Sequence, residues 1–131
     1  MPQLNCIVTT PEKTALETRC TFIVLPLFDG EIGIAPGRAP LIGRLGFGEM
    51  RITHGSETTR YFLDGGFVQV SGNVVSILTD NVVPAKDLDV QAARDQLAAS
   101  LKMPIATAEL ERVRDHNIDQ ARARLRTARR R

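Results

Sequence analysis

The spacing of apolar residues changes near Pro84, and this change constrains the fold more than any other feature of the chain. Before Pro84, short alternating segments lie between turn signals at intervals of roughly 8–12 residues, which is typical of an antiparallel sandwich or barrel. After Pro84, the apolar residues follow one face of a helix: Val90, Ala93, Leu97 and Leu101. We therefore expect a β domain over residues 1–86 and a helical domain over residues 87–131.

Two helices are predicted in the second domain. Asp87 or Asp89 can cap a first helix at about 88–102, because a short polar side chain can accept the first unpaired amide hydrogens. The dipeptide Met103-Pro104 then interrupts the pattern. A second helix is expected at about 104–129, with the proline in its first turn.

The second helix has a thin apolar stripe that consists mostly of alanine and is interrupted by Asn117. The stripe comprises Ala106, Leu110, Val113, Asn117, Ala121, Leu125 and Ala128. At ~25 cal/mol per Å² of buried apolar surface, so little area can contribute only a few kcal/mol of docking free energy. The sequence therefore predicts a weakly docked helix that can move.

Glycines are expected to end several of the β segments. The segment "ETTRYFLDGG" ends on Gly65-Gly66, and a new segment begins at Phe67. The segment "EMRITHG" begins at Glu49, and a hairpin turn at His54-Gly55-Ser56 follows it. Each of these segments is interpreted as a separate short strand.

The stretch Asp29–Gly43 contains four glycines and two prolines, so it could be a phosphate-binding loop or a structural corner. No Lys-Ser or Lys-Thr pair follows the glycines, and their spacing is not G-x-G-x-x-G. Asp29-Gly30 and Pro36-Gly37 are turn dipeptides on either side of a short strand, Glu31–Ala35. The pattern favours two tight corners around a strand.

No set of residues in the sequence indicates an enzyme, a metal site or a cofactor site. Cys6, Cys20, His54 and His116 lack metal-ligand spacing. The two cysteines could face each other in a hairpin, but two reduced thiols are the more common state in a cytosolic sheet. We expect no catalytic residue, no bound metal and no cofactor.

The positive charge of the chain is concentrated in its last segment. Residues 105–131 carry eight arginines and four acidic side chains, whereas residues 1–86 carry seven basic and eight acidic side chains. Such a tail suits acidic protein surfaces or nucleic acid. Because aromatic residues make up only 5% of the chain, few bases could stack on it. We expect no nucleic-acid partner, and a small basic-tailed nucleic-acid-binding protein is the alternative.

No apolar run approaches the ~18 residues that a membrane-spanning helix requires. The N-terminal stretch "MPQLNCIVTT" lacks the basic start and the long apolar core of a signal peptide. We therefore expect a cytosolic chain, or one that reaches a membrane only through a partner.

Two specific motifs resemble those of the epsilon subunit of F-type ATP synthases. They are "GEIGIAPGRAPLI" at 30–42 and "YFLDGGFVQVSGNVVSILTD" at 61–80, and "DLD" at 87–89 also agrees. The order of a β part and then two helices is similar to that family over the whole chain. The resemblance implies a β-sandwich of about ten strands followed by an antiparallel two-helix hairpin.

The resemblance also implies a function. It implies a non-catalytic rotor subunit of the central stalk, peripheral on the cytoplasmic face of a bacterial inner membrane, that joins the gamma subunit to the c-ring. Asp29, Gly30 and Glu31 would lie in the corner that contacts the c-ring, with Arg38 near it.

The helices of this family regulate ATP hydrolysis through the alpha and beta subunits. The resemblance implies that arginines of the second helix face acidic surfaces of those subunits and inhibit hydrolysis. The candidate residues are Arg112, Arg114, Arg122, Arg124 and Arg126.

One departure from the family concerns ATP. Some members bind ATP through the pattern [IL]-D-x-x-R-A, and here the matching segment is Leu88–Ala93. Asp89 is present, but Ala92 replaces the arginine, and Arg94 lies about 200° further round a helix. Because a phosphate would lose its guanidinium partner, we expect no tight ATP binding.

Overall fold

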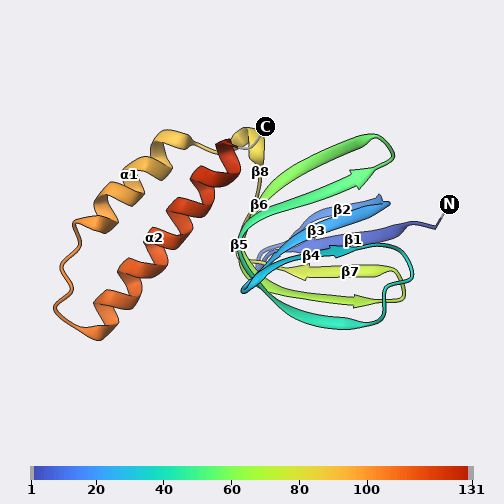
Figure 1. Ribbon diagram of the computed structural model, residues 1–131, viewed down its shortest axis with the longest axis horizontal. Coiled ribbons are helices and arrows are strands. Elements are labelled where there is room, and N and C mark those ends of the chain that lie inside the picture. The colour runs from blue at the N-terminus through green and yellow to red at the C-terminus, as the bar shows by residue number, and fades with distance from the viewer. Residues whose placement is uncertain (1, 130–131) are drawn as a thin grey trace.

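The computed structural model describes residues 2–129 and shows a β-sandwich with a helical hairpin against one end (Figure 1). The strands are β1 (Leu4–Thr9), β2 (Thr14–Cys20), β3 (Phe22–Leu27), β4 (Gly30–Ile34), β5 (Leu41–His54), β6 (Glu57–Ser71), β7 (Val74–Leu78) and β8 (Val82–Pro84). They pair in the order β2-β1-β7-β6-β5-β3-β4, and β8 pairs with β6. The predicted sandwich followed by helices is confirmed.

The sandwich differs from the expectation in two respects. Residues 2–129 contain eight strands and not about ten, because β5 and β6 are 14 and 15 residues long. These strands continue through positions that the sequence indicated as ends of segments. In addition, β1 and β7 pair in parallel, whereas the other pairs are antiparallel.

Glycines bend the two long strands and do not end them. Gly66 has a φ of 114°, and a Cβ atom there would lie 1.8 Å from the carbonyl oxygen of Leu78. Only glycine fits such a position without moving the backbone. Gly46 approaches the neighbouring strand in a similar way, since a Cβ atom there would lie 3.0 Å from the Leu27 carbonyl oxygen. Both strands turn at the end of the sandwich that faces the helices (Figure 1).

The core lies between the two layers and consists of inward-facing residues that alternate with outward ones. In β1, for example, Leu4, Cys6 and Val8 are buried while their neighbours are partly exposed. The buried core cluster contains Leu4, Cys6, Val8, Cys20, Ile23, Leu25, Ile34, Leu45, Met50, Ile52, Leu63, Val68, Val70, Val75 and Ile77. This alternation is the period of a half-buried strand.

A single 3-10 turn (Ala85–Asp87) leads from β8 to two antiparallel helices, α1 (Val90–Leu101) and α2 (Ala108–Arg129) (Figure 1). Asp89 caps α1, because its Oδ1 accepts a hydrogen bond from the Ala92 amide at 2.9 Å. Thr107 caps α2 by accepting from the Leu110 amide at 3.1 Å. This cap explains why α2 starts at Ala108 and leaves Pro104 in the connection.

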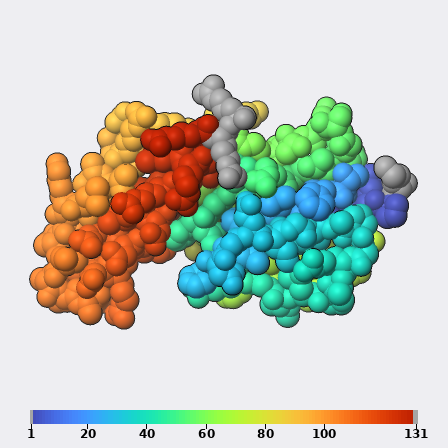
Figure 2. Space-filling model, in the orientation of Figure 1, coloured from blue at the N-terminus to red at the C-terminus, as the bar shows by residue number. Residues whose placement is uncertain are grey.

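Helix α2 packs against the sandwich from His116 toward its C-terminus. Its buried residues are Ile118, Ala121, Ala123, Leu125 and Thr127. Ala106, Leu110 and Val113 were expected on the buried stripe, but they are exposed. The N-terminal half of α2 and the helix connection extend past the sandwich, so these residues have no sheet to pack on (Figure 2).

Candidate functional site

The predicted corner is the turn between β3 and β4. The Phe28 amide donates to the Arg44 carbonyl oxygen at 2.9 Å, which fixes the turn against β5. Asp29 and Gly30 are exposed at its tip. Glu31 is half exposed and lies 3.5 Å from the Arg51 guanidinium. The corner therefore presents two carboxylates at one end of the sandwich.

Arg38 does not lie near this corner, which corrects the expected arrangement. It follows β4, and the adjacent Gly37 amide donates to Asn73 Oδ1 at 2.7 Å in the β6–β7 turn. The five residues of β4 separate it from Gly30. At ~3.3 Å per residue, that separation is roughly 15 Å. The structure thus places Arg38 at the opposite end of β4.

An exposed apolar row crosses the outer face of the sandwich beside the corner. Its members are Phe28 (67% exposed), Ile42 (79%), Phe67 (56%) and Leu78 (52%), and they are called the outer apolar row below. Phe67 pairs with both Arg44 and Leu78, so the row runs across neighbouring strands. The Arg44 guanidinium stacks 4.5 Å from the Phe28 ring. The sequence contained a signal for this row, because Phe67 and Leu78 alternate with the buried Val68 and Ile77.

A cleft of about 2090 Å³ lies between the sandwich and α2, and three members of the outer apolar row line it: Phe28, Phe67 and Leu78. Figure 2 shows the two walls, the orange part of α2 and the blue and cyan part of the sandwich. Gly30 and Glu31 line one wall. The opposite wall carries three of the candidate arginines, Arg112, Arg122 and Arg126. The structure therefore brings part of the predicted corner and part of the predicted regulatory set to one cleft.

The other two candidate arginines have partners within the protein. Arg114 lies 3.4 Å from Asp115, and its Nε is buried without a hydrogen-bond partner among the described residues. Arg124 donates to Gln96 Oε1 at 3.3 Å, and its guanidinium lies 5.5 Å from the Phe62 ring. Arg130 and Arg131, which complete the basic tail, lie outside the described residues.

Polar contacts join α2 to β6. Gln120 Nε2 donates to both carboxylate oxygens of Asp64, at 2.9 and 2.8 Å. Arg60 donates to Glu49 Oε2 from Nε at 3.0 Å and from Nη2 at 2.8 Å. The same Nη2 also donates to the Thr127 carbonyl oxygen near the end of α2. None of these contacts was expected from the sequence, since Asp64 and Gln120 are 56 positions apart.

Glu49 is the buried carboxylate that holds two arginines in this region. It is only 6% exposed, and its carboxylate contacts the guanidinium groups of both Arg60 and Arg51. Burial by itself raises the pKa of the Glu49 carboxyl group, but hydrogen bonds from Arg60 and Arg51 outweigh burial and leave the pKa below its ordinary value. Glu49 therefore stays charged at neutral pH.

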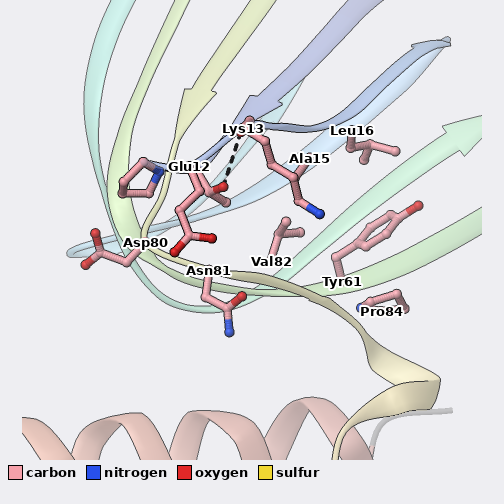
Figure 3. Close-up of a pocket in the computed structure, with 11 residues that line it drawn as sticks. Glu12, Lys13, Ala15, Leu16, Tyr61, Asp80, Asn81, Val82 and Pro84 are labelled. Atoms are coloured by element: carbon pink, nitrogen blue, oxygen red, sulfur yellow. Dashed lines mark hydrogen bonds between the residues drawn. The ribbon is translucent and has the colours of Figure 1, made fainter.

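A smaller cavity of about 630 Å³ lies between the β1–β2 turn and β8 (Figure 3). Glu12, Lys13, Tyr61 and Asp80 are among its lining residues. Burial raises the pKa of the Tyr61 hydroxyl group, with a smaller contribution from Cys6. The hydrogen bonds between lining residues join Thr10 and Lys13 within the turn. This arrangement does not pair a nucleophile with a base, as covalent catalysis requires.

The two cysteines are neighbours in the core, whereas the two histidines make other contacts. Cys6 and Cys20 are free and buried on neighbouring strands. Burial, and to a lesser extent Cys20, raise the pKa of Cys6 to about 12. His54 contacts Gln3, and His116 packs edge-on against Phe47 at 5.0 Å. Among residues 2–129, no cluster of three or more metal-ligating side chains occurs.

None of the helices in the described part of the chain is long and apolar enough to cross a membrane.

Residues 3–85 match the family described as the beta-sandwich domain of the ATP synthase delta/epsilon chain. The chain is 45% identical over 126 residues to the ATP synthase epsilon chain of Rhodopirellula baltica, which covers 96% of this chain and 98% of that one. It is 37% identical to the epsilon chain of Leptospira borgpetersenii, over 77% of this chain and 80% of that one.

Two solved structures share the fold. A chain of the Euglena gracilis mitochondrial ATP synthase aligns with a TM-score of 0.84 at 20% identity, covering 94% of this chain and 80% of that one. A chain in the central stalk and c-ring of the Tetrahymena thermophila mitochondrial ATP synthase aligns with a TM-score of 0.75 at 18% identity, covering 97% of both chains. At these identities the likeness concerns the fold, which includes both the sandwich and the hairpin.

Proposed function

This chain belongs to the family of ATP synthase epsilon chains, and on that premise we propose that it acts as a rotor subunit of the central stalk. Its role is to join the gamma subunit to the c-ring, so that rotation driven by ion flow reaches the catalytic subunits. The chain itself carries out no chemistry. We place it peripherally, on the cytoplasmic face of a bacterial inner membrane, because its relatives named above at 45% and 37% identity are bacterial.

The outer apolar row is the observation that carries this proposal. Phe28, Ile42, Phe67 and Leu78 are each more than half exposed on a sandwich whose other large apolar side chains are largely buried. Contiguous exposed apolar side chains mark a surface that another protein covers. We assign this row to the gamma subunit and the adjacent corner, Asp29–Glu31, to the c-ring.

Helix α2, which is called the arm below, is assigned to the alpha and beta subunits. Arg112, Arg122 and Arg126 are exposed on α2 and are free to meet acidic surfaces when the helix leaves the sandwich. Arg114 and Arg124 would join them only after losing their present contacts. In this role α2 inhibits ATP hydrolysis by entering the ring of alpha and beta subunits, which is called the catalytic ring below.

Binding to purified gamma subunit tests the assignment of the row. The substitution Phe67→Glu should weaken binding about 10- to 100-fold, because burying one large apolar side chain is worth about 1.5–3 kcal/mol. Thr59→Glu is the matched control, since Thr59 is exposed near the β5–β6 hairpin turn. Parental affinity of the Phe67→Glu variant would contradict the assignment.

Capture on c-rings tests the corner separately. The charge reversal Glu31→Lys should reduce capture, and Arg38→Glu should reduce it less, because Arg38 lies at the other end of β4. Equal capture of the Glu31→Lys variant and the parent would remove the corner from the proposed interface.

A further inference from the structure

One face of β6 contacts α2 through three residues at alternate positions. Arg60, Phe62 and Asp64 point to the same side of the strand, because successive side chains in a strand alternate. Phe62 is fully buried, yet it is not part of the core cluster between the layers. The hairpin is the element that covers it, and Arg124 of α2 stacks 5.5 Å from its ring. On this face of β6, the docked helix thus contacts an aromatic side chain with a polar group on each side.

At the first of these polar groups, one glutamine joins three elements. Gln120 donates from Nε2 to both oxygens of Asp64 on β6. Its Oε1 accepts from Gln96 Nε2 of α1 at 2.8 Å. A primary amide has two donor hydrogens and an oxygen with two lone pairs, so these contacts engage its donor group and one of its two acceptor positions. Loss of Gln120 therefore loosens α2 from the sandwich and from α1 together.

At the second polar group, Arg60 contacts the end of α2. The carbonyl groups in the last turn of a helix have no partner within the helix, and the end carries partial negative charge. Arg60 donates to one of them, at Thr127, while Glu49 holds its guanidinium from the other side. The buried Glu49 carboxylate fixes the direction in which Arg60 points.

We propose that Asp64 and Arg60 form a latch that sets the fraction of time for which α2 is docked, and thereby the strength of its inhibition. The effect on inhibition rests on the proposed inhibitory role of α2, whereas the effect on docking does not. Neither latch contact is an ion pair with α2, because one partner is an amide and the other is a main-chain carbonyl. Salt therefore weakens the latch less than it weakens contacts between the exposed arginines and acidic partners. Raising the salt concentration shifts the arm toward the docked state.

Hydrogen exchange of the isolated chain tests the latch. The substitution Gln120→Glu places a second carboxylate against Asp64, and amides of residues 118–127 should exchange at least tenfold faster. The double variant Asp64→Asn/Gln120→Glu should restore slow exchange, since the new amide on β6 can donate to the new carboxylate on α2. A merely structural role would not predict rescue by this exchange of donor and acceptor.

Val113→Glu is the control, because it adds the same charge to an exposed position of α2 outside the latch. Circular dichroism distinguishes an undocked helix from a melted one. The milder Asp64→Asn, which keeps one acceptor oxygen, should give a smaller increase in exchange if Gln120→Glu fails to fold. Unchanged exchange in Gln120→Glu, or a double variant that exchanges as fast as the single one, would overturn the latch.

The assembled complex separates the latch from the brake. If the arm inhibits, Gln120→Glu should slow ATP hydrolysis, because the undocked arm enters the catalytic ring more often. Faster exchange with unchanged hydrolysis would leave the latch standing and would refute the braking role. Slower hydrolysis that is restored in the double variant would support both.

Discussion

The sandwich and the hairpin bury their residues by different means. The sandwich closes around a continuous apolar core that includes Ile23, Leu25 and Leu63, each fully buried. Helix α2 buries two alanines together with Ile118, Leu125 and Thr127, and it adds polar contacts to Asp64 and Arg60. Apolar contacts on this scale make a part that unfolds as a whole, whereas a few polar contacts make a part that can detach while it stays helical.

The largest effect is expected from breaking the core. Leu25→Ala should lower the free energy of unfolding by about 2–5 kcal/mol, because a buried leucine loses its transfer free energy and leaves a cavity. Chemical denaturation measures this change. Leu125 of α2 is 7% exposed. The comparison requires that Leu125→Ala lowers the free energy of unfolding by less than Leu25→Ala does. An equal cost at both sites would mean that the hairpin is as integral as the core.

A smaller effect is expected when Glu49 is protonated. Its pKa is lowered in the folded state, so its stabilising contribution is full above the ordinary value of 4.5 and is lost as the pH falls through the lowered pKa. Hydrogen bonds to charged groups contribute about 1.5–3 kcal/mol each. The protection factors of the α2 amides, which are corrected for the intrinsic pH dependence of exchange, should therefore fall in acid before the sandwich unfolds. In Glu49→Gln, this fall should be absent, and low protection should already be present at neutral pH.

Deleting residues 105–131, which removes α2, tests whether this helix is dispensable for folding. The sandwich should keep its cooperative transition, and the assembled complex should form and hydrolyse ATP several-fold faster without its brake. The truncation also uncovers Phe62, so a modest fall in the melting temperature is expected. Hydrolysis at the parental rate would mean that α2 does not inhibit in this protein.

The arginines of α2 should have effects of opposite sign. Arg122→Ala/Arg126→Ala removes exposed charges, each worth ~0–1 kcal/mol, and should relieve inhibition slightly, more at low salt. Arg124→Ala removes a contact with Gln96 and with the Phe62 ring, so it should undock the arm and increase inhibition. ATPase assays of the complex at two salt concentrations distinguish these results. Effects of the same sign would mean that Arg124 acts as the exposed residues do.

The smallest effect is expected when ATP is added to the isolated chain. Millimolar ATP should leave the melting temperature of the isolated chain nearly unchanged, since Ala92 replaces the arginine of the ATP motif and the Asp89 carboxylate already caps α1. A ligand at a hundred times its Kd would add ~2.7 kcal/mol, which thermal unfolding detects easily. A clear shift would show that another cation replaces the missing arginine.

Local patterns predicted the sandwich and the helices, because the apolar spacing of a strand or a helix depends on residues that are close along the chain. The same local signs placed segment ends within β5 and β6, which are continuous strands. Gly65-Gly66 has the composition of a strand end, yet its pairing with β5 continues on both sides. Whether a glycine ends a strand or bends it depends on the strand beside it, which local patterns do not describe.

The candidate site was less accessible to sequence reasoning, because its contacts join distant positions. The corner at Asp29–Glu31 could be found from its turn residues and from the family motif. The resemblance placed Arg38 near this corner, but β4 separates the two. The contact between Asp64 and Gln120 could not be predicted, because no local pattern relates a strand carboxylate to a helix amide that lies 56 positions away.

The continuity of β5 and β6 has a mechanical consequence for a rotor. Thirteen residue pairs join these strands from Leu41–Val70 to His54–Glu57, and the paired ribbon runs through both layers of the sandwich. Sliding one layer over the other would require shearing this ribbon, and not only the side chains between the layers. A load applied at the Asp29–Glu31 corner is therefore carried along covalent bonds and a hydrogen-bonded ladder. The sandwich behaves as a stiff coupling, while compliance is confined to the hairpin.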